Sequence, residues 1–331
     1  NFYLTGERCM EPGDASGTGF LDIATRGWSS EILDAMDSER DLRDVLPTLR
    51  LENEFIGKLR SEVADQLRLP HGIGVSVGGG DNMMSAIGTG NVTEGHVTIS
   101  LGTSGTAYAY SETPVIDERG EIAAFCSSSG GWLPLLCTMN CTAGTELMRS
   151  LFGADIEGFE ALIAQARPGS DGVLTLPFFN GERTPNLPQG KGCIFGLDSR
   201  NTGSQNILRS AMEGATFALL YGVDRLIELG VDCEEIVLTG GGANSPTWRQ
   251  TVADVCNKPV TFLEKTEGAA LGAALQAFSC LTAQNLVDCA EDFLSVASKS
   301  QVEPNDDVVG LYADIYTGYR EAVENVSHMY R

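Results

Sequence analysis

The sequence Gly78-Gly79-Gly80-Asp81-Asn82 decides how the fold of this chain is interpreted. It follows alternating apolar residues typical of a β-strand and precedes residues 83–87, which are typical of a helix. Three glycines let the backbone turn sharply and leave room for another group to approach. A strand, a glycine turn, an acid and a helix often place one carboxylate at the mouth of a cleft in α/β proteins. The pattern equally fits a tight turn in which Asp81 caps the helix.

Downstream of this turn, predicted strands alternate with predicted helices, which indicates an α/β fold. The strands are recognised by short apolar runs between turn residues, and the helices by apolar residues at helical spacing. The expected strands are residues 97–101, 106–110, 122–127, 132–139, 236–238 and 260–263, and the expected helices are residues 206–229, a segment from Pro246, residues 267–278 and residues 308–328.

The region upstream of the turn has shorter and less regular patterns. Residues 20–24 predict a short strand, and Ser29 is expected to cap a short amphipathic helix. Residues 52–68 predict a second helix, because Phe55, Leu59, Val63 and Leu67 recur at helical spacing. This region is too short and too irregular to form a complete domain by itself.

The charge of the chain limits its partners. With 331 residues the chain can form one large domain or two medium ones, and 45 acidic against 22 basic residues give a net charge of −23. Such a chain repels nucleic acids and anionic membrane surfaces at long range. No apolar run is long enough to span a membrane. An anionic nucleotide could still bind with local help from backbone N–H groups, helix N-termini or a metal cation.

Cysteine and histidine offer little catalytic or metal-binding chemistry. The nine cysteines include no Cys-x-x-Cys pair, so we expect reduced thiols in a cytoplasmic protein. The three histidines are His71, His96 and His328, which leaves little material for a Ser-His-Asp or multi-histidine metal mechanism. No signal peptide is visible. The chain begins with Asn1 and not with Met, and its first residues look like the middle of a protein, so we expect a fragment or a processed chain.

Two further glycine turns are candidate nucleotide sites. Gly102-Thr103-Ser104-Gly105 lies between two predicted strands, where hydroxyls and free N–H groups can surround phosphate oxygens, although an ordinary hairpin has the same pattern. Gly240-Gly241-Gly242-Ala243-Asn244 joins a strand to a helix that starts at Pro246, and its glycines admit a flat ring or a phosphate. The latter is neither a Walker loop nor a dinucleotide fingerprint, and it equally fits a plain strand-to-helix turn.

A fourth turn, residues 178–185, contains the adjacent charges Glu182 and Arg183 in an otherwise apolar setting. For Glu182 we expect a structural ion pair rather than a direct part in catalysis.

Taken in order, these segments resemble the FGGY family of carbohydrate kinases, and within it most closely the xylulokinases. The resemblance covers most of the chain. It rests on Asp14-Ala15-Ser16-Gly17-Thr18, Gly78-Gly79-Gly80-Asp81-Asn82, Ser100-Leu101-Gly102-Thr103-Ser104-Gly105, Asn180-Gly181-Glu182-Arg183-Thr184-Pro185, Gly192-Cys193-Ile194-Phe195-Gly196-Leu197, Asn206-Ile207 with Ser210-Ala211-Met212-Glu213, and Gly240-Gly241-Gly242-Ala243-Asn244.

The resemblance implies an actin-like ATPase (ribonuclease H-like) fold and roles for particular residues. Asp81 would be the catalytic base and would bind the sugar together with Asn82. ATP would be bound by Gly102, Thr103, Ser104, Gly241, Gly242, Ala243 and Asn244. Mg²⁺ would accompany ATP, with no protein ligand named. For Asp14, stabilisation of a turn is favoured over a place in the cleft. The helix that contains Gly268 and Gly272 looks like an interdomain connector, or else a closely packed helix with no hinge role.

The resemblance also implies a division of the chain. Residues 1–74 would be the remainder of the N-terminal sugar-kinase domain, residues 75–300 an essentially complete C-terminal ATP-binding domain, and residues 301–331 a C-terminal helix. The family's usual N-terminal region, with its Gly-x-Asp-x-Gly-Thr phosphate loop and a Met-His pair, has no counterpart in the sequence.

The expected reaction is phosphorylation of D-xylulose by ATP to give D-xylulose 5-phosphate, in the cytoplasm. Sugar and ATP would be the partners, and a homodimer stays open. The alternatives are another FGGY kinase, of the ribulokinase, gluconokinase or glycerol kinase type, or a truncated non-catalytic binding module.

Overall fold

A six-stranded sheet forms the centre of the molecule. The computed structural model describes residues 1–263, 268–296 and 299–330. The central strand β12 is parallel to its neighbours β7 and β13, whereas β8, β9 and β14 run antiparallel to the strands beside them. From one edge to the other the strands are β14 (Lys299–Val302), β13 (Val260–Leu263), β12 (Cys233–Thr239), β7 (Gly95–Leu101), β8 (Gly105–Ala109) and β9 (Leu135–Thr138).

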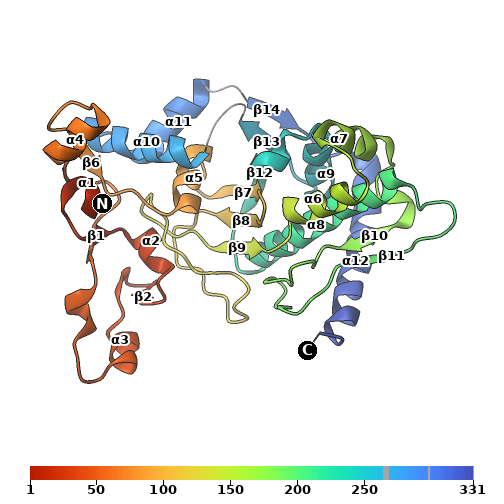
Figure 1. Cartoon of the computed structure of the whole chain (residues 1–331), viewed down its shortest axis with the longest axis horizontal. Coiled ribbons are helices and arrows are strands. Elements are labelled where there is room, and N and C mark those ends of the chain that lie inside the picture. Colours follow the sequence, from red (N-terminus) through yellow and green to blue (C-terminus); the bar gives the residue numbers. More distant parts are fainter. Residues whose placement is uncertain (264–267, 297–298, 331) are drawn as a thin grey trace.

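Helices cover both faces of this sheet (Figure 1). The two sets of helices pack into separate apolar clusters, and the larger cluster also contains the central strands. One set consists of α6 (Thr142–Leu151), α7 (Ile156–Gln165), α8 (Ser204–Glu228), α9 (Pro246–Cys256) and α12 (Asp306–Ser327), and the other of α5 (Asp81–Thr89), α10 (Gly268–Thr282) and α11 (Leu286–Val296). A helix–sheet–helix arrangement of this kind is the expected α/β architecture.

A buried polar network fixes α12 on the long helix α8. Arg209 Nε donates to Glu213 Oε1 at 2.8 Å, and the Tyr312 hydroxyl donates to the same oxygen at 2.7 Å. Burial of an ion pair is tolerated where hydrogen bonds satisfy its remaining atoms. Arg209 meets this condition by donating to the carbonyls of Ile163 and Ala166 at the end of α7.

The N-terminal region extends from this body as a series of short elements (Figure 1). Its strands pair locally and in small sheets, not with the central sheet. They are β1 (Cys9–Met10) with β4 (Thr48–Leu49), β2 (Leu21–Asp22) with β3 (Gly27–Trp28), and β5 (Phe55–Lys58) with β6 (Gly74–Ser76), accompanied by helices α1 (Phe2–Thr5), α2 (Pro12–Ser16), α3 (Ser30–Met36) and α4 (Ser61–Leu67). The remaining elements are the hairpin β10 (Leu174–Leu176) with β11 (Cys193–Phe195) and the 3₁₀ turns η1 (Leu42–Val45), η2 (Ser170–Gly172) and η3 (Gly241–Asn244).

Most predicted elements are present, and several predictions need correction. The predicted strand over residues 122–127 is wrong, because Ala123 and Cys126 form only isolated bridges, and of the predicted strand over residues 132–139 only Leu135–Thr138 is a strand. Ser29 caps α3 by accepting from Ile32 N, as expected. The predicted helix over residues 52–68 is wrong in its first half, because residues 55–58 form strand β5 and only Ser61–Leu67 is helical. The segment 301–331, expected to be a C-terminal helix, begins with the end of β14, and helix α12 starts at Asp306. The predicted start of the helix at Glu267 lies outside the described residues.

Candidate active site

The glycine turn places Asp81 at the start of helix α5. Gly80 is the N-cap residue, so Asp81 is the first helical residue and not the cap. Its carboxylate is exposed and accepts from the backbone N–H of Asn82 at 2.8 Å. Gly78 has φ 77°, which L-amino acids other than glycine rarely adopt.

Helix α10 supports the glycine turn from behind. The buried side chain of Gln276 accepts from Gly78 N at 2.9 Å and donates to Gly78 O at 3.1 Å. The two helices cross at glycines: a Cβ on Gly272 would lie 1.7 Å from the Met84 carbonyl oxygen, and one on Gly88 would lie 1.9 Å from the Gly268 carbonyl oxygen. The small residues noted in the sequence therefore allow a close helix crossing that fixes the base of α5.

Asp81 faces a cavity of about 370 Å³ between the N-terminal elements and strands β8 and β9. Asn82 lines the same cavity, so the structure brings both predicted sugar-binding residues together. Asp14 of α2 also lines this cavity, whereas the sequence favoured a turn-stabilising role for Asp14 over a place in the cleft. The other lining residues are Gly13, Gly17, Gly80, Met83, Thr106, Gly120, Glu121, Ala123, Phe125, Leu135, Cys137 and Arg183.

Glu11 fixes Asp14 in this position. The buried Glu11 carboxylate caps α2 by accepting from Gly13 N at 2.7 Å and from Asp14 N at 2.5 Å. It also reaches the glycine turn, since a Cβ on Gly79 would lie 3.2 Å from Glu11 Oε1. Burial raises the pKa of Glu11 to about 7, although its backbone hydrogen bonds act in the opposite direction. Glu11 thus connects α2 to the turn that carries Asp81.

The expected ion pair between Glu182 and Arg183 does not form. Glu182 is buried and accepts from Met139 N at 2.6 Å, from Asn140 Nδ2 at 3.1 Å and from Arg183 N at 2.8 Å. Its carboxylate therefore satisfies backbone and amide donors, and burial raises its pKa above the usual range. Arg183 instead lines the Asp81 cavity.

The two turns predicted to bind ATP lie at the carboxyl ends of the neighbouring strands β7 and β12. Gly102-Thr103-Ser104 connects β7 to β8, and its carbonyls accept from the first residues of α6, with Thr142 N donating to Gly102 O at 2.9 Å. The second turn packs on the end of β7, because a Cβ on Gly240 would lie 2.8 Å from the backbone of Leu101. Parallel strands β7 and β12 end here together, which is where ligands bind in open α/β sheets.

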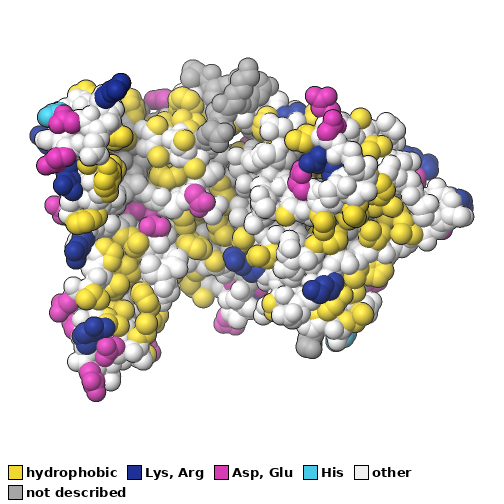
Figure 2. All heavy atoms as spheres, viewed as in Figure 1, with side chains coloured by type: hydrophobic (Ala, Val, Ile, Leu, Met, Phe, Trp, Pro, Cys, Tyr) yellow, Lys and Arg dark blue, Asp and Glu magenta, His cyan; other side chains and the backbone are white. Residues whose placement is uncertain are grey.

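A larger cavity of about 590 Å³ opens beside the second turn. Gly241, Gly242 and Asn244 line it, whereas Ala243 is fully buried beneath them. The opposite wall belongs to α6 and α7 and includes Ile156 and Phe159. Hydrophobic side chains gather on this face of the molecule over α6 to α8 (Figure 2). An apolar cavity beside a glycine turn suits a flat heterocyclic base.

A third cavity, of about 430 Å³, lies between the 590 Å³ cavity and α5. It shares Gly241 and Asn244 with the 590 Å³ cavity, and on its other side it is lined by Ser85, one turn after Asp81. Its lining is rich in hydroxyl and backbone groups, including Ser100, Thr239 and Thr89. This cavity thus adjoins the apolar one at the second glycine turn and extends to α5, the helix that begins with Asp81.

Comparison with known proteins agrees with this arrangement. The sequence profile of the C-terminal domain of the FGGY family of carbohydrate kinases matches residues 97–281, and that of the N-terminal domain matches residues 1–88. The chain belongs to the FGGY family of carbohydrate kinases. Membership confirms the expected actin-like fold, and the N-terminal match overturns the expectation that the family's N-terminal region is absent.

Similar proteins within the FGGY family include sugar kinases of several kinds. The xylulose kinase of Haemophilus influenzae is 44% identical over 319 residues, which are 96% of this chain and 65% of that protein. A structure titled xyloylose kinase from Brucella ovis has a TM-score of 0.91 at 26% identity, covering 99% of this chain and 67% of that one. A gluconate kinase from Lactobacillus acidophilus has a TM-score of 0.91 at 25% identity, covering 99% and 66%. The FGGY chain described here thus spans about two thirds of the length of these relatives.

Sequence reasoning missed the residues that position the site. Gln276 lies inside a helix of small residues, and Glu160 of α7 accepts from the Ser245 hydroxyl and from Thr247 N at the start of α9. A lone amide or carboxylate on a helix gives no sequence signal of such a distant partner. Within the described ranges, no group of three or more His, Cys, Asp or Glu residues could hold a metal ion, and no helix could cross a membrane.

Proposed function

We propose that the protein containing this chain transfers the γ-phosphoryl group of ATP to a ketose, D-xylulose being the favoured substrate. The observation that carries the proposal is the exposed Asp81 carboxylate, which starts α5 and faces one cavity, while a second cavity lies between the same helix and the glycine turn at residues 240–244. The similarity to xylulose kinases favours D-xylulose among the sugars.

In the proposed reaction Asp81 acts as the general base. The sugar hydroxyl oxygen forms a bond to the γ-phosphorus, the bond from that phosphorus to the bridging oxygen of ADP breaks, and the hydroxyl proton goes to the Asp81 carboxylate. Asn82 offers one amide donor and one acceptor for neighbouring sugar hydroxyls. Because α5 is fixed by Gln276 and the glycine crossing, the carboxylate keeps its position without help from the sugar.

ATP would occupy the other two cavities. We propose that Gly241, Gly242 and Asn244 line the adenosine site, with Ala243 supporting them from below. Gly102, Thr103 and Ser104 would contact the outer phosphates with their N–H and hydroxyl groups. Mg²⁺ bound to these phosphates would neutralise part of their charge. We assign it no protein ligand, since the described residues contain no cluster that could bind it alone.

Three further features belong to the same proposal. The nine cysteines are all free in the structure, which supports a reducing compartment such as the cytoplasm. The likeness to gluconate kinase keeps another FGGY substrate as the second candidate. We also keep the division at residues 74 and 300, and a homodimer, as proposals for solution experiments.

Substitution of Asp81 tests the assignment of the base. In the protein containing this chain, Asp81→Asn should lower kcat for a ketose by about 10²–10⁴-fold, because the proton acceptor is lost while the shape of the side chain is kept. The melting temperature should stay within about 2 °C of wild type, since the carboxylate is exposed. Turnover close to wild type would sink the assignment. A panel of xylulose, ribulose, gluconate and glycerol identifies the substrate.

A further inference from the structure

Arg183 is the basic side chain that lines the Asp81 cavity, within the part of the chain that the structure describes. Three carboxylates, those of Asp14, Asp81 and Glu121, line the same cavity. Its guanidinium forms no salt bridge with any described residue, although the chain has 45 acidic side chains against 22 basic ones. An unpaired cation among carboxylates is available to a ligand that carries negative charge.

The loop that carries Arg183 is held in one conformation. Its neighbour Glu182 is anchored to the end of β9 through Met139 N and Asn140, and the backbone of Glu182 pairs in both directions with Leu187, at 2.8 and 3.0 Å. Gly181 has φ 71°, and a Cβ there would lie 2.3 Å from the Pro188 carbonyl oxygen. The Glu182 carboxylate thus accepts from Met139 N, Asn140 Nδ2 and Arg183 N, and it forms no salt bridge with the Arg183 guanidinium.

Arg183 lines the cavity together with strand residues that adjoin the phosphate-binding turn. Thr106 directly follows the turn that ends at Gly105, and it pairs across the sheet with Cys137. Both side chains line the Asp81 cavity, and the positive charge of Arg183 lies close enough to lower the pKa of the Cys137 thiol against the larger effect of burial. The guanidinium therefore lies near strand residues next to the turn proposed to bind the outer phosphates.

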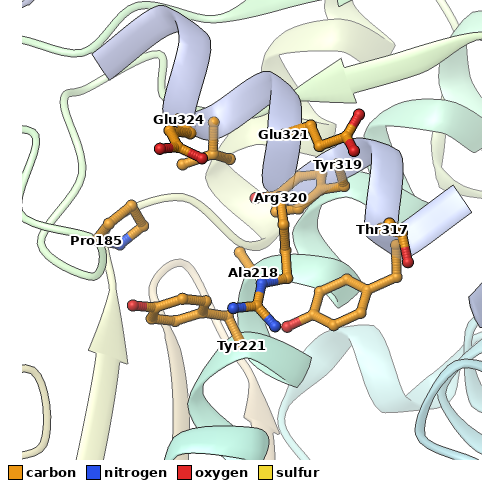
Figure 3. A pocket seen from close by; sticks show the side chains of 10 residues that line it. Pro185, Ala218, Tyr221, Thr317, Tyr319, Arg320, Glu321 and Glu324 are labelled. Carbon is orange, nitrogen blue, oxygen red and sulfur yellow. The ribbon is translucent and has the colours of Figure 1, made fainter. Parts of the chain in front are cut away.

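The opposite side of this loop faces a different cavity. Pro185 lines a cavity of about 380 Å³ between α8 and α12, together with Tyr221 and Arg320 (Figure 3). The Tyr221 hydroxyl donates to Glu121 Oε1 at 2.7 Å, so Glu121 of the Asp81 cavity already has a partner other than Arg183. The loop thus lies between two cavities, is held by the bonds of Glu182, and contributes Arg183 to the lining of the cavity that contains Asp81.

We propose that Arg183 binds the γ-phosphoryl group of ATP during its transfer, a role that rests on the kinase function proposed above. As the phosphorus moves from the bridging oxygen of ADP to the sugar hydroxyl, negative charge is spread over its three peripheral oxygens. A guanidinium with fixed N–H donors stabilises that charge, in a cleft whose other charged groups are carboxylates. Arg183 would then bind the group that Asp81 alone would repel.

The first test separates kcat from KM in the protein that contains this chain. Arg183→Ala should lower kcat about 10²–10³-fold, with a change in the ketose KM of less than about threefold and an unchanged melting temperature. Added guanidinium chloride at millimolar concentration should restore part of kcat, and Arg183→Lys should retain more activity than Arg183→Ala. The control is Arg200→Ala, because Arg200 is exposed and pairs only with Asp198 in the described structure; it should match wild type.

Two outcomes would overturn the proposal. A raised ketose KM with unchanged kcat would mean that Arg183 binds the sugar, and a lowered melting temperature without guanidinium rescue would mean a structural role.

The second test needs no turnover and so separates this proposal from the kinase function. With ketose present, wild type should bind the ATP analogue AMP-PNP about tenfold more tightly than Arg183→Ala does, while both bind ADP equally. Equal loss of AMP-PNP and ADP affinity, or no loss of either, would contradict contact with the γ-phosphoryl group. If wild type phosphorylates none of the panel sugars, the kinase function fails, and this comparison still decides the role of Arg183.

Discussion

At the scale of single residues, Glu11 makes the stability of this FGGY chain depend on pH. Burial raises its pKa to about 7 from an ordinary value of 4.5, so the folded state binds this proton more tightly than the unfolded state. The contribution is fully present below about pH 4.5 and is lost as pH rises through about 7. We expect the free energy of unfolding to fall by about 3 kcal/mol over this range on account of Glu11.

Glu11→Gln isolates that contribution, because the amide keeps the size of the side chain but does not titrate. Urea unfolding of both proteins at about pH 5 and about pH 8 should show wild type losing its advantage over the variant as pH rises. If the advantage of wild type instead grows with pH, the backbone hydrogen bonds from Gly13 and Asp14 dominate over burial, and the carboxylate is bound in its charged form.

At the scale of elements, local pattern predicted the regular helices and the glycine turns but not the pairing of short segments. Ser29 marks a helix start because its side chain accepts from a backbone N–H three residues later, a signal that depends only on nearby residues, and the helix that it was expected to cap is present. The prediction of a helix over residues 55–58 is wrong. The spacing of Phe55, Leu59 and Val63 fits a helix, but Gly57 and pairing with β6 favour a strand. The pairing of β5 depends on β6, about 18 positions later in the chain. The spacing of apolar residues within residues 52–68 carries no information about that partner strand.

The candidate site follows the same division. Asp81 and the glycine turns could be predicted from the sequence, because turns require particular residue types such as glycine. Arg183 was expected to pair with Glu182 because they are adjacent in sequence, yet the carboxylate turns toward Met139 N, some 40 residues away. Gln276 reaches Gly78 from almost 200 residues away. Such contacts come from tertiary packing, which decides where a polar side chain finds its partner.

The crossing of α5 and α10 gives a prediction at the element scale. Gly272→Ala should destabilise the protein by about 1–3 kcal/mol, because its Cβ would overlap the Met84 carbonyl, a backbone atom that cannot turn aside. Gly310→Ala in α12 is the matched control. Gly310 is exposed, and no atom lies within 4 Å of the position that its Cβ would take, so alanine there should stabilise the helix by up to about 1 kcal/mol.

Thermal unfolding of the two variants measures the difference between their stabilities. Equal stabilisation by both alanines would mean that the helices separate at little cost and do not fix Asp81. Because α5 carries the proposed base, Gly272→Ala should also lower kcat, whereas Gly310→Ala should leave kcat unchanged.

At the scale of the whole molecule, a net charge of −23 opposes the approach of an anionic nucleotide, while the proposed site attracts it only at short range. Salt screens the long-range repulsion within a Debye length of about 10 Å at 0.1 M, and contacts inside the cavities are screened less. We therefore expect the association rate of ATP to rise about threefold between about 20 and 200 mM NaCl. Stopped-flow binding of ATP measures this rate, and uncharged adenosine, whose rate should not change, is the control. A rate that falls with salt would mean that local cations such as Arg183 attract ATP from a distance and that the field of the whole chain does not govern its approach.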